Sequence, residues 1–326
     1  MPGVKMVVPI DAGSNRGVAV IADSTWTALK ARDALKIDWD PGANGQVSSG
    51  SIRQALRESA RKRGAIAQKV GDPEAASKAA GKTVTAEYEL PFVAHATMEP
   101  MNCTARVTAD KAEVWVATQD LEGCHLQVSK TSGLPLEKCF VNRYDPGGGF
   151  GRRGRADYVR QAVLVAKQMP GTPVKLIWSR EEDMTHCQYH PTTMCKLTGG
   201  LDKDGNLVGL HMRISGQSIL ASLLPQNLVN GMDPATFQGV MAQGVEAAYG
   251  YTVPNLLIDH AMRNPHITAG FWRGVNVNQN AVYMECFMDE LAEAAGQDPL
   301  AFRLKILKPK WAAVLKAAAD KAGYGK

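Results

Sequence analysis

Apolar positions in the first part of the chain form short runs separated by one amphipathic stretch. The compact apolar run 18–22 predicts a buried strand, and the helical spacing of apolar residues over 25–35 predicts a helix. A short strand is expected at 37–39, and an amphipathic helix at 52–62. The Ala/Lys-rich stretch 71–82 indicates a loop with a helical turn, and therefore the end of a small first unit.

From residue 83 the chain alternates between apolar and polar positions in the manner of half-buried strands. This alternation predicts strands at 84–90, 103–107, 112–117, 136–144 and 173–179, and a hairpin over 196–214. Helical periodicity predicts helices at 121–129, 155–169, 280–295 and 299–307, and only weakly within 216–248. The mixture predicts an α+β (mixed α/β) protein.

The composition is that of a folded protein. Hydrophobic residues make up 45% and charged residues 21% of the chain, which excludes a disordered tail, a collagen-like repeat and a coiled coil. The length of 326 residues suggests two domains. A net charge of +5 with scattered basic residues does not indicate a nucleic-acid partner. The densest basic stretches, 61–63 and 152–160, are expected to be solvated helix faces.

The six cysteines have neither a CxxC pair nor the Cys/His spacing of a metal site. We therefore expect all six to be small buried apolar side chains, and we expect no metal ion held by protein ligands. The sequence also lacks a run of about 18 apolar residues, so no transmembrane helix is predicted.

The segment DPGGGFGRR at 145–153 lies between a predicted strand and a predicted helix. Four glycines in five positions let a ligand approach the backbone N–H groups, and the following helix N-terminus favours an anion. Arg152, Arg153 and Arg155 add positive charge to the same region. A flexible surface connection is the alternative, but Phe150 among the glycines is untypical of linkers. The segment is therefore interpreted as a ligand-binding loop.

A dinucleotide site is the first rival interpretation, because residues 149–154 match G-x-G-x-x-G. Pro146 and two further glycines separate this match from the preceding strand, where a dinucleotide-binding turn is tight. The nearest suitable acid, Glu181, follows Gly149 by 32 residues, whereas the fingerprint expects about 20. No Gly-Lys-Ser/Thr follows the glycines, which excludes a P-loop.

Three further segments contain polar residues that are candidates for a functional site. His95 and Glu99 are candidates for an acid/base pair, although a hydrogen-bonded structural histidine is the simpler interpretation. Thr118-Gln119-Asp120 directly follows a predicted strand, where ligand-facing residues collect in α/β folds. The glycine- and amide-rich stretch 271–280 precedes a helix, so Arg273 is expected to face an anion as a bidentate donor.

Six sequence blocks, in the same order, resemble the molybdenum-binding large subunit of the xanthine dehydrogenase/aldehyde oxidase family. The most similar branch is that of the isoquinoline 1-oxidoreductase β subunits. The blocks are VAVIADSTWTALKARDALKIDWD, ELPFVAHATMEPMN, VWVATQD, GGGFGRR with DYVRQAVLVAKQ, PVKLIWSREEDM and GFWRGVNVNQNAVYMECFMDELA.

The resemblance implies that a substrate is hydroxylated with oxygen from water while two electrons pass to molybdenum. It also implies that the dithiolene of a pterin holds the metal, in the cytosine dinucleotide form in most bacterial members of this branch. The catalytic residues implied are Gln119, Phe150 and Arg273. The cofactor-binding residues implied are Gln119, Gly148, Gly149, Phe150, Gly151, Arg152, Arg273, Gly274 and Gln279.

The resemblance also bears on partners and substrate. Electrons would leave through a small iron–sulfur subunit, because this sequence has no cysteine array for such clusters. Gly154 stands where xanthine-oxidising members have a glutamate that binds the purine, and Val275 stands where they have an aromatic residue beside the substrate. The first departure argues against a purine, and the second leaves the placement of the substrate open. An N-heterocycle other than a purine, or an aldehyde, is the expected substrate.

By the same resemblance, residues 1–82 correspond to part of the hammerhead domain with a linker, and residues 83–326 to the first half of the cofactor-binding domain. The family's general-base glutamate lies in a Gly-Val-Gly-Glu segment that does not occur here. We therefore expect an internal piece of a longer subunit, without activity on its own. A non-catalytic cofactor-binding module and a dinucleotide-dependent dehydrogenase are the alternatives. The periplasm or a partner-mediated membrane location is expected, with the cytoplasm as the alternative.

Overall fold

The computed structural model describes residues 1–12, 15–241 and 250–325, which form two compact units. Unit 1 consists of Met1–Gly45 and Ala94–Cys187, and unit 2 consists of Gln46–Val93 and Gln188–Lys326. Each unit has its own hydrophobic core. Because each unit is built from two stretches of chain, the units do not follow the single boundary predicted between residues 82 and 83.

Unit 1 is built around a four-stranded sheet with the order β7-β6-β5-β8. Strands β6 and β7 are parallel, whereas β5 is antiparallel to both of its neighbours. Helices α4 and α5 pack together against this sheet, and their apolar faces form the core with it. The bounds are β5 Asn102–Val107, β6 Ala112–Ala117, α4 Leu121–Ser132, β7 Cys139–Tyr144, α5 Asp157–Ala166, β8 Val174–Ile177 and α6 Arg180–Thr185.

A two-stranded hairpin and one helix complete unit 1. β1 (Val4–Ala12) pairs with β2 (Asn15–Ala22) in antiparallel fashion, and α1 (Thr25–Asp33) follows. The hairpin packs on α5, where Val165 contacts an apolar cluster formed by the two strands. Ser24 begins α1 as an N-cap, because its side chain accepts a hydrogen bond from the N–H of Thr27.

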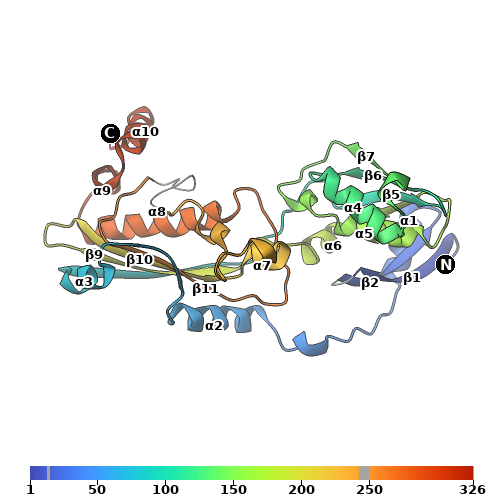
Figure 1. Cartoon of the computed structure of the whole chain (residues 1–326), viewed down its shortest axis with the longest axis horizontal. Helices are drawn as coiled ribbons and strands as arrows, with labels where there is room; N and C mark the ends of the chain where they lie inside the picture. Colours follow the sequence, from blue (N-terminus) through green and yellow to red (C-terminus); the bar gives the residue numbers. More distant parts are fainter. Residues whose placement is uncertain (13–14, 242–249, 326) are drawn as a thin grey trace. The chain divides into compact units, whose positions relative to one another are not determined.

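Unit 2 is built around a five-stranded sheet with the order β3-β11-β10-β9-β4. In Figure 1, α8 lies along one face of this sheet, and α2 and α3 lie on the other face. Consecutive glycines of β9 accommodate the two layers, because a Cβ at Gly199 would contact Leu291 of α8 and a Cβ at Gly200 would contact Ala80 beside α3.

The elements of unit 2 account for the rest of the regular structure. The strands are β3 Ala65–Val70, β4 Lys82–Leu90, β9 Thr193–Leu201, β10 Leu207–Gly216 and β11 Leu256–Met262. The helices are α2 Ser49–Ala60, α3 Pro73–Ala79, α7 Ile219–Leu223, α8 Asn276–Ala294, α9 Pro299–Ile306 and α10 Pro309–Ala322.

The mixed α/β fold class is confirmed, and the differences from prediction are local. Residues 37–39 form no strand, and strands β3 and β11 were not predicted. β3 is exposed or half-buried without alternation, and β11 is buried on both faces, so neither shows a period of two. The weakly helical segment 216–248 contains α7 and two short 3-10 turns up to residue 241, and 242–248 lie outside the described residues.

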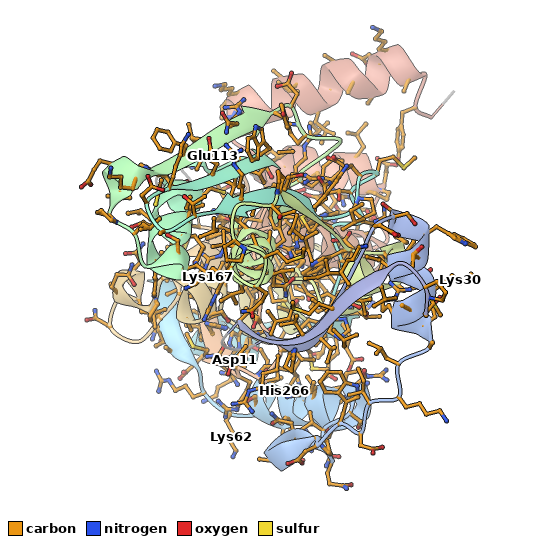
Figure 2. The ribbon with its side chains drawn as sticks, turned by 90° about the vertical axis from the view of Figure 1, so that its right-hand side faces the viewer. Asp11, Lys30, Lys62, Glu113, Lys167 and His266 are labelled. Atoms are coloured by element: carbon orange, nitrogen blue, oxygen red, sulfur yellow. The ribbon has the colours of Figure 1, made fainter. Side chains whose placement is uncertain are left out.

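Surface expectations are confirmed in part. Arg61, Lys62 and Arg63 are exposed at the end of α2, and the side chain of Lys62 points away from the ribbon in Figure 2. Five cysteines are buried as expected, but Cys286 is exposed on α8, so the expectation for that residue is wrong. Among the described residues, none of the helices has the length and apolar character needed to cross a membrane.

Candidate functional site

The loops that follow β6 and β7 lie together at the carboxyl ends of these two strands. Strands β6 and β7 are parallel neighbours, with Ala117 opposite Tyr144 at their ends. Gln119 follows β6, and residues 145–151, here called the glycine loop, follow β7. Because the carboxyl ends of neighbouring parallel strands meet at one edge, the topology brings Gln119 to the glycine loop.

Direct hydrogen bonds join Gln119 to this region. The N–H of Gly151 donates to Gln119 Oε1 at 3.1 Å, and the N–H of Gln119 donates to the carbonyl oxygen of Arg153 at 3.0 Å. A Cβ at Gly149 would lie only 2.4 Å from Gln119 Oε1. Glycine at position 149 is therefore required for the Gln119 side chain to lie against the loop.

Three consecutive N–H groups of the glycine loop are open. In the part of the chain that the structure describes, the N–H groups of Gly148, Gly149 and Phe150 donate to no acceptor. The N–H groups of the flanking glycines, in contrast, are bonded to side chains. Successive backbone N–H groups form a concave donor set that favours an anion or an electron-rich oxygen, so this loop is a candidate ligand site.

The backbone at this edge is strained. Phe150 has a φ of 53° and Ala96 has a φ of 48°, values that a residue with a Cβ adopts at an energetic cost. A Cβ at Gly148 would lie 3.7 Å from the backbone nitrogen of Met98, so the segment containing Ala96 borders the loop. The Phe150 side chain is 40% exposed. Strain of this kind persists at sites where the surrounding structure fixes an unfavourable backbone.

The expectation that the basic stretch 152–160 is a solvated helix face is wrong for its first two residues. Arg152 and Arg153 are 1% and 0% exposed. Arg152 forms a bidentate pair with Asp157, with both N–O distances at 2.8 Å. Its guanidinium also lies 5.4 Å from the centre of the Trp178 ring. In this structure the charge of Arg152 is therefore neutralised inside unit 1, and its cofactor contact stays a prediction.

Arg153 supports the glycine loop through its guanidinium. This group donates to the carbonyl oxygen of Gly148 at 2.8 Å and to both the carbonyl and the carboxylate of Glu99 at 2.7 Å. The carbonyl oxygen of Arg153 accepts from Gln119 and from the hydroxyl of Thr118. Arg153 thus connects the segment before β5, the segment after β6 and the glycine loop.

Glu99 anchors the same loop, and its pairing with His95 as an acid/base pair stays a prediction. Its carboxylate accepts from the N–H of Gly147 at 3.0 Å and from Asn102 Nδ2 at 3.0 Å. Partial burial raises the pKa of Glu99, but the hydrogen bonds from Asn102 and Gly147 and the charge of Arg153 outweigh it, so the pKa lies below its ordinary value. Glu99 is therefore ionised at neutral pH.

The second candidate loop, residues 271–275, lies in unit 2 and leads into α8. Gly274 has a φ of 88°, and a Cβ there would lie 2.2 Å from Asn278 Oδ1. Asn278 Nδ2 donates to the carbonyl oxygen of Arg273 at 2.5 Å. Val275 has a φ of 49°, and its carbonyl oxygen lies 3.1 Å from His190 Nε2. This loop is thus also strained and held by polar side chains.

Arg273 and Gln279 occupy opposite environments in unit 2. The Arg273 side chain is exposed, and its guanidinium has no hydrogen bond or ion pair within the described ranges. Gln279 is 1% exposed, and its Oε1 accepts from the hydroxyl of Thr193 at 3.2 Å. These residues belong to unit 2, whereas Gln119 belongs to unit 1, so their shared site and their roles stay predictions.

The sequence pattern did not indicate Arg153 and Glu99 as supports of the loop. A usable signal was present, because an arginine next to a run of glycines can hold the loop as well as its ligand. Charge along the sequence does not show on which side of the backbone a guanidinium lies.

The dinucleotide-binding alternative fails on topology. The segment 149–154 lies between β7 and β8, which are the opposite edges of the sheet and are not parallel neighbours. Residues 152–154 form a 3-10 turn, and α5 begins only at Asp157. A dinucleotide fingerprint requires a tight strand–turn–helix unit, which is not formed here. The described residues also contain no group of three or more His, Cys, Asp or Glu side chains suited to a metal ion.

The glycine loop beside Gln119 is a candidate cofactor site, and comparison with known families identifies the domain. Residues 57–307 match the model of the molybdopterin cofactor-binding domain. The chain therefore belongs to this family, and the resemblance to molybdenum-binding large subunits is confirmed.

Relatives and solved structures agree with this assignment. The chain is 26% identical over 326 residues to one of the subunits of nicotinate dehydrogenase from Pseudomonas putida, covering 99% of this chain and 27% of that protein. It is 27% identical to the beta subunit of isoquinoline 1-oxidoreductase from Brevundimonas diminuta, covering 99% and 42%. Quinoline 2-oxidoreductase from Pseudomonas putida 86 has a similar fold, with a TM-score of 0.74 at 14% identity, covering 99% of this chain and 47% of that chain. The chain thus spans less than half the length of these proteins.

Proposed function

We propose that the chain forms the cofactor-binding part of a molybdenum hydroxylase large subunit. The complete enzyme would hydroxylate an N-heterocycle or an aldehyde with oxygen from water and pass two electrons to a small iron–sulfur subunit. Relatives named nicotinate dehydrogenase and isoquinoline 1-oxidoreductase support the N-heterocycle, and relatives named aldehyde oxidoreductase support the aldehyde. The observation that carries the proposal is the open donor set of the glycine loop, beside Gln119, in a chain of this family.

The residues of unit 1 fit a molybdenum–pterin cofactor. The open N–H groups of Gly148, Gly149 and Phe150 are donors for the oxygen atoms of such a group. The glycines at 147 and 149 leave room for the side chains of Glu99 and Gln119 to pack against the loop, which holds its backbone in place for a ligand. Gln119 is exposed, and its Nε2 has no acceptor in the described part of the chain, so it is available as a further donor.

Each residue would have a distinct part in this site. Phe150 would place an apolar ring beside the reacting centre, and Gln119 would hold an oxygen atom by hydrogen bonding. Arg273, whose guanidinium is exposed and unpaired within the described residues, would bind an anionic part of the cofactor. The cofactor, when bound, supplies the two-electron acceptor for the hydroxylation. The cytosine dinucleotide form is our proposal for its chemical identity.

The chain alone is proposed to bind cofactor without turning over substrate. The general-base glutamate segment implied by the family resemblance does not occur among the 326 residues. Abstraction of a proton from the attacking oxygen needs such a base within hydrogen-bond reach. We also propose that the complete enzyme works in the periplasm or at the membrane through its partners, with the cytoplasm as the alternative.

Cofactor analysis of the purified chain tests this proposal. The chain would be produced in a host that makes the cytosine dinucleotide cofactor, and molybdenum, pterin and released CMP would be quantified against protein. We expect all three in near-equal molar amounts, without hydroxylation of nicotinate or isoquinoline. Folded protein without pterin contradicts the proposal. Turnover by the isolated chain contradicts the part that assigns the general base elsewhere.

A further inference from the structure

The glycine loop is bonded to the short segment that precedes β5, residues 96–99, here called the 96–99 segment. The N–H of Glu99 donates to the carbonyl oxygen of Gly147 at 3.1 Å, and the N–H of Gly147 donates to the Glu99 carboxylate at 3.0 Å. Because these two bonds run in opposite directions between the same two residues, the position of the glycine loop depends on the position of the 96–99 segment.

The backbone of the 96–99 segment needs support from outside the segment. Ala96 has a φ of 48°, a conformation that costs energy in a residue with a Cβ. Met98 is 88% exposed, so its side chain contributes little packing. The hydroxyl of Thr97 donates to the carbonyl oxygen of Glu99 at 2.7 Å, but this bond lies within the segment. A strained backbone of this kind persists only where surrounding structure fixes it.

Arg180 of α6 provides this support. Its Nη2 donates to the carbonyl oxygen of Thr97 and, at 3.0 Å, to that of Met98. Its Nη1 donates to Oδ2 of Asp183, in the next turn of the same helix, at 3.2 Å. The planar guanidinium serves both partners at once, because its nitrogens point in fixed directions. Arg180 thus joins the 96–99 segment to α6.

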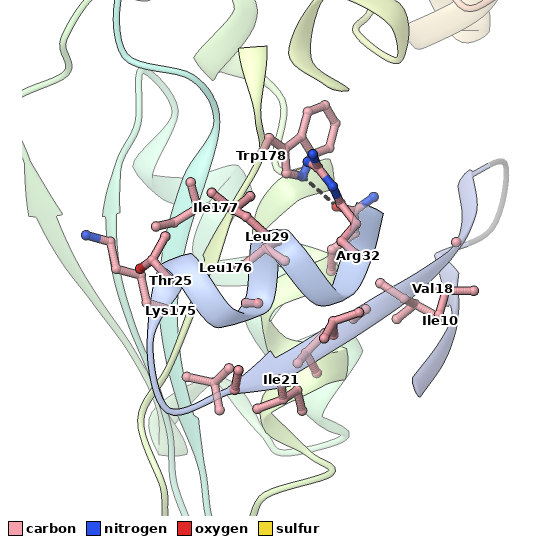
Figure 3. Close-up of a pocket in the computed structure, with 18 of the residues that line it drawn as sticks. Ile10, Val18, Ile21, Thr25, Leu29, Arg32, Lys175, Leu176, Ile177 and Trp178 are labelled. Carbon is pink, nitrogen blue, oxygen red and sulfur yellow. Dashed lines mark hydrogen bonds between the residues drawn. The ribbon is translucent and has the colours of Figure 1, made fainter. Parts of the chain in front are cut away.

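Helix α6 is held in place by the residues that join it to β8. Trp178 is 5% exposed, its N–H donates to the carbonyl oxygen of Met101 at 2.9 Å, and its indole Nε1 donates to Gln161 of α5 at 2.8 Å. Figure 3 shows the Trp178 side chain where β8 borders a pocket of unit 1. Ser179 then caps α6 by accepting from the N–H of Glu182 at 3.2 Å. The guanidinium of Arg180 is therefore attached to the core of unit 1.

Asp183 is the buried counter-charge of Arg180. It is only 2% exposed, although it is a carboxylate. Burial raises the pKa of this carboxyl above its ordinary value, and the neighbouring guanidiniums of Arg152, Arg180 and Arg153 oppose that rise. A carboxylate removed from water needs compensating positive charge. The burial of Asp183 therefore fits a role in holding Arg180 at the two carbonyl oxygens.

We propose that Arg180, held by Asp183, is a positioning residue for the glycine loop. It fixes the 96–99 segment and, through the two bonds between Glu99 and Gly147, the three open N–H groups that face the ligand. Its action is indirect, since its donors are bonded to the protein itself. The effect on the loop follows from these contacts alone, whereas the consequence for cofactor binding rests on the proposed function.

Nuclear magnetic resonance of the loop amides tests the positioning role without any cofactor. Arg180→Met removes the guanidinium and keeps an apolar side chain. In the full chain labelled with nitrogen-15 at glycine, we expect the amide resonances of Gly147, Gly148 and Gly149 to shift. The N–H of Gly147 should exchange about tenfold faster, because its acceptor on Glu99 is no longer fixed. Core amides of β6 should be accelerated less, whereas a general loss of stability would accelerate both alike.

Arg106→Met is the matched control. The side chain of Arg106 is 39% exposed and that of Arg180 is 38% exposed, and each forms an ion pair with a carboxylate. Arg106 pairs with Glu113 near the start of β6, whereas the glycine loop lies at the other end of that strand. The loop resonances of this variant should match those of the parent. Equal shifts in the two variants would overturn the proposal.

Asp183→Asn provides a second test, which remains available if Arg180→Met does not fold. Asparagine has nearly the same size and keeps an oxygen acceptor, but it has no charge. We expect the same glycine resonances to shift, by a smaller amount. Glu182→Gln removes one charge from a neighbouring side chain that is 47% exposed, and it should leave these resonances unchanged. Parent-like resonances in Asp183→Asn would overturn the role of Asp183.

Pterin retention measures the consequence for the cofactor. In chains purified from a cofactor-competent host, we expect Arg180→Met to release pterin during dialysis about tenfold faster than Arg106→Met, since most changes in affinity appear in the dissociation rate. Equal release from both would overturn this consequence. A parent chain that holds no pterin would contradict the proposed function instead, and the glycine resonances would still decide whether Arg180 positions the loop.

Discussion

The glycine loop of unit 1 and the loop 271–275 of unit 2 have similar residue types, but their arginines have different environments. Each contains glycine and a non-glycine residue at positive φ, precedes helical structure, and has an arginine within it or two residues beyond it. Arg153, two residues after the glycine loop, is 0% exposed and holds that loop through Glu99. In the second the arginine is exposed and unpaired within the described residues, and Asn278 and His190 hold the loop.

This difference shows that a positive charge next to a glycine run has two separate uses. A buried guanidinium satisfies carbonyl oxygens and so fixes the backbone, which leaves the N–H groups of the loop for a ligand. An exposed guanidinium is itself the donor to the ligand. Variants of the two arginines should therefore have opposite profiles for stability and for ligand binding.

The largest expected effect is on stability, in Arg153→Met. Removal of this guanidinium leaves the carbonyl oxygen of Gly148 without its donor. It also takes one donor each from the carbonyl and the carboxylate of Glu99, which keep their other hydrogen bonds. Because Glu99 is 39% exposed, solvent offsets part of the loss, and we expect a decrease of about 2–3 kcal/mol in the free energy of unfolding. Urea unfolding of the full chain measures it. Arg273→Met is the control, and an equal loss there would show that the two arginines do not differ.

As the pH falls, protonation of buried histidines in unit 2, such as His190 beside loop 271–275, should reduce stability before protonation of Glu99 beside the glycine loop does. Burial lowers the pKa of His190, which contacts Val275, and it lowers the pKa of His260 in the same unit to about 4. Their folded-state pKa values lie below the unfolded value, so this stability is complete above about pH 6.5 and declines below it, in the case of His260 down to about pH 4. For His260 the slope reaches about 1.4 kcal/mol per pH unit.

The carboxylate of Glu99, which holds the glycine loop, responds at lower pH. The pKa of Glu99 is below its ordinary value, so its contribution is present above that value and is lost only as the pH falls through the folded-state pKa. Hydrogen exchange of peptides from each unit, at pH values from about 7.5 to 4, measures the order. His260→Gln should flatten the response of unit 2, and loss of unit 1 first would contradict the account.

Arg273→Gln should weaken cofactor binding without destabilising the chain. We expect a roughly tenfold lower cofactor affinity, equivalent to about 1.4 kcal/mol, because one charge-assisted contact is lost. The free energy of unfolding should stay within about 0.5 kcal/mol of the parent. Pterin retention during dialysis, measured beside urea unfolding, checks both expectations. Unchanged pterin retention would remove Arg273 from the proposed site.

The smallest effect is expected from Asn278→Ala. The variant removes the hydrogen bond from Nδ2 to the carbonyl oxygen of Arg273, which is worth about 1 kcal/mol. Gly274 loses its close neighbour at the same time, so Gly274→Ala should be better tolerated in this background than in the parent. Non-additivity in the double-mutant cycle measures this coupling, and strict additivity would contradict it.

Much of the fold was predictable, because long periodic segments specify their own elements. The helix at 280–295 appears as α8 with its N-terminus four residues earlier, and the hairpin predicted over 196–214 appears as β9 and β10. Strands β3 and β11 were missed since β3 joins the sheet through β11, more than 180 residues later in the chain. Such pairing depends on tertiary contacts that local patterns do not contain.

For the candidate site, the sequence indicates which residues are unusual but not how they are arranged. The position of Gln119 after a strand and the run of glycines both pointed to a ligand edge, and the structure places them in contact. The burial of Arg152 and Arg153 was not predictable, because it depends on their ion pairs with Asp157 and Glu99. The density of charged residues along a sequence does not show whether their side chains are buried.

The central claim is that the open N–H groups of the glycine loop hold the molybdenum–pterin cofactor. Gly149→Ala tests it most directly, because the new Cβ would lie 2.4 Å from Gln119 Oε1 and displace that side chain or the loop. Gly154→Ala is the matched control, since a Cβ there has open space and no positive φ. With both variants folded and produced in a cofactor-competent host, the account predicts pterin and molybdenum lost from Gly149→Ala and retained in Gly154→Ala. Equal cofactor content in the two proteins would contradict it.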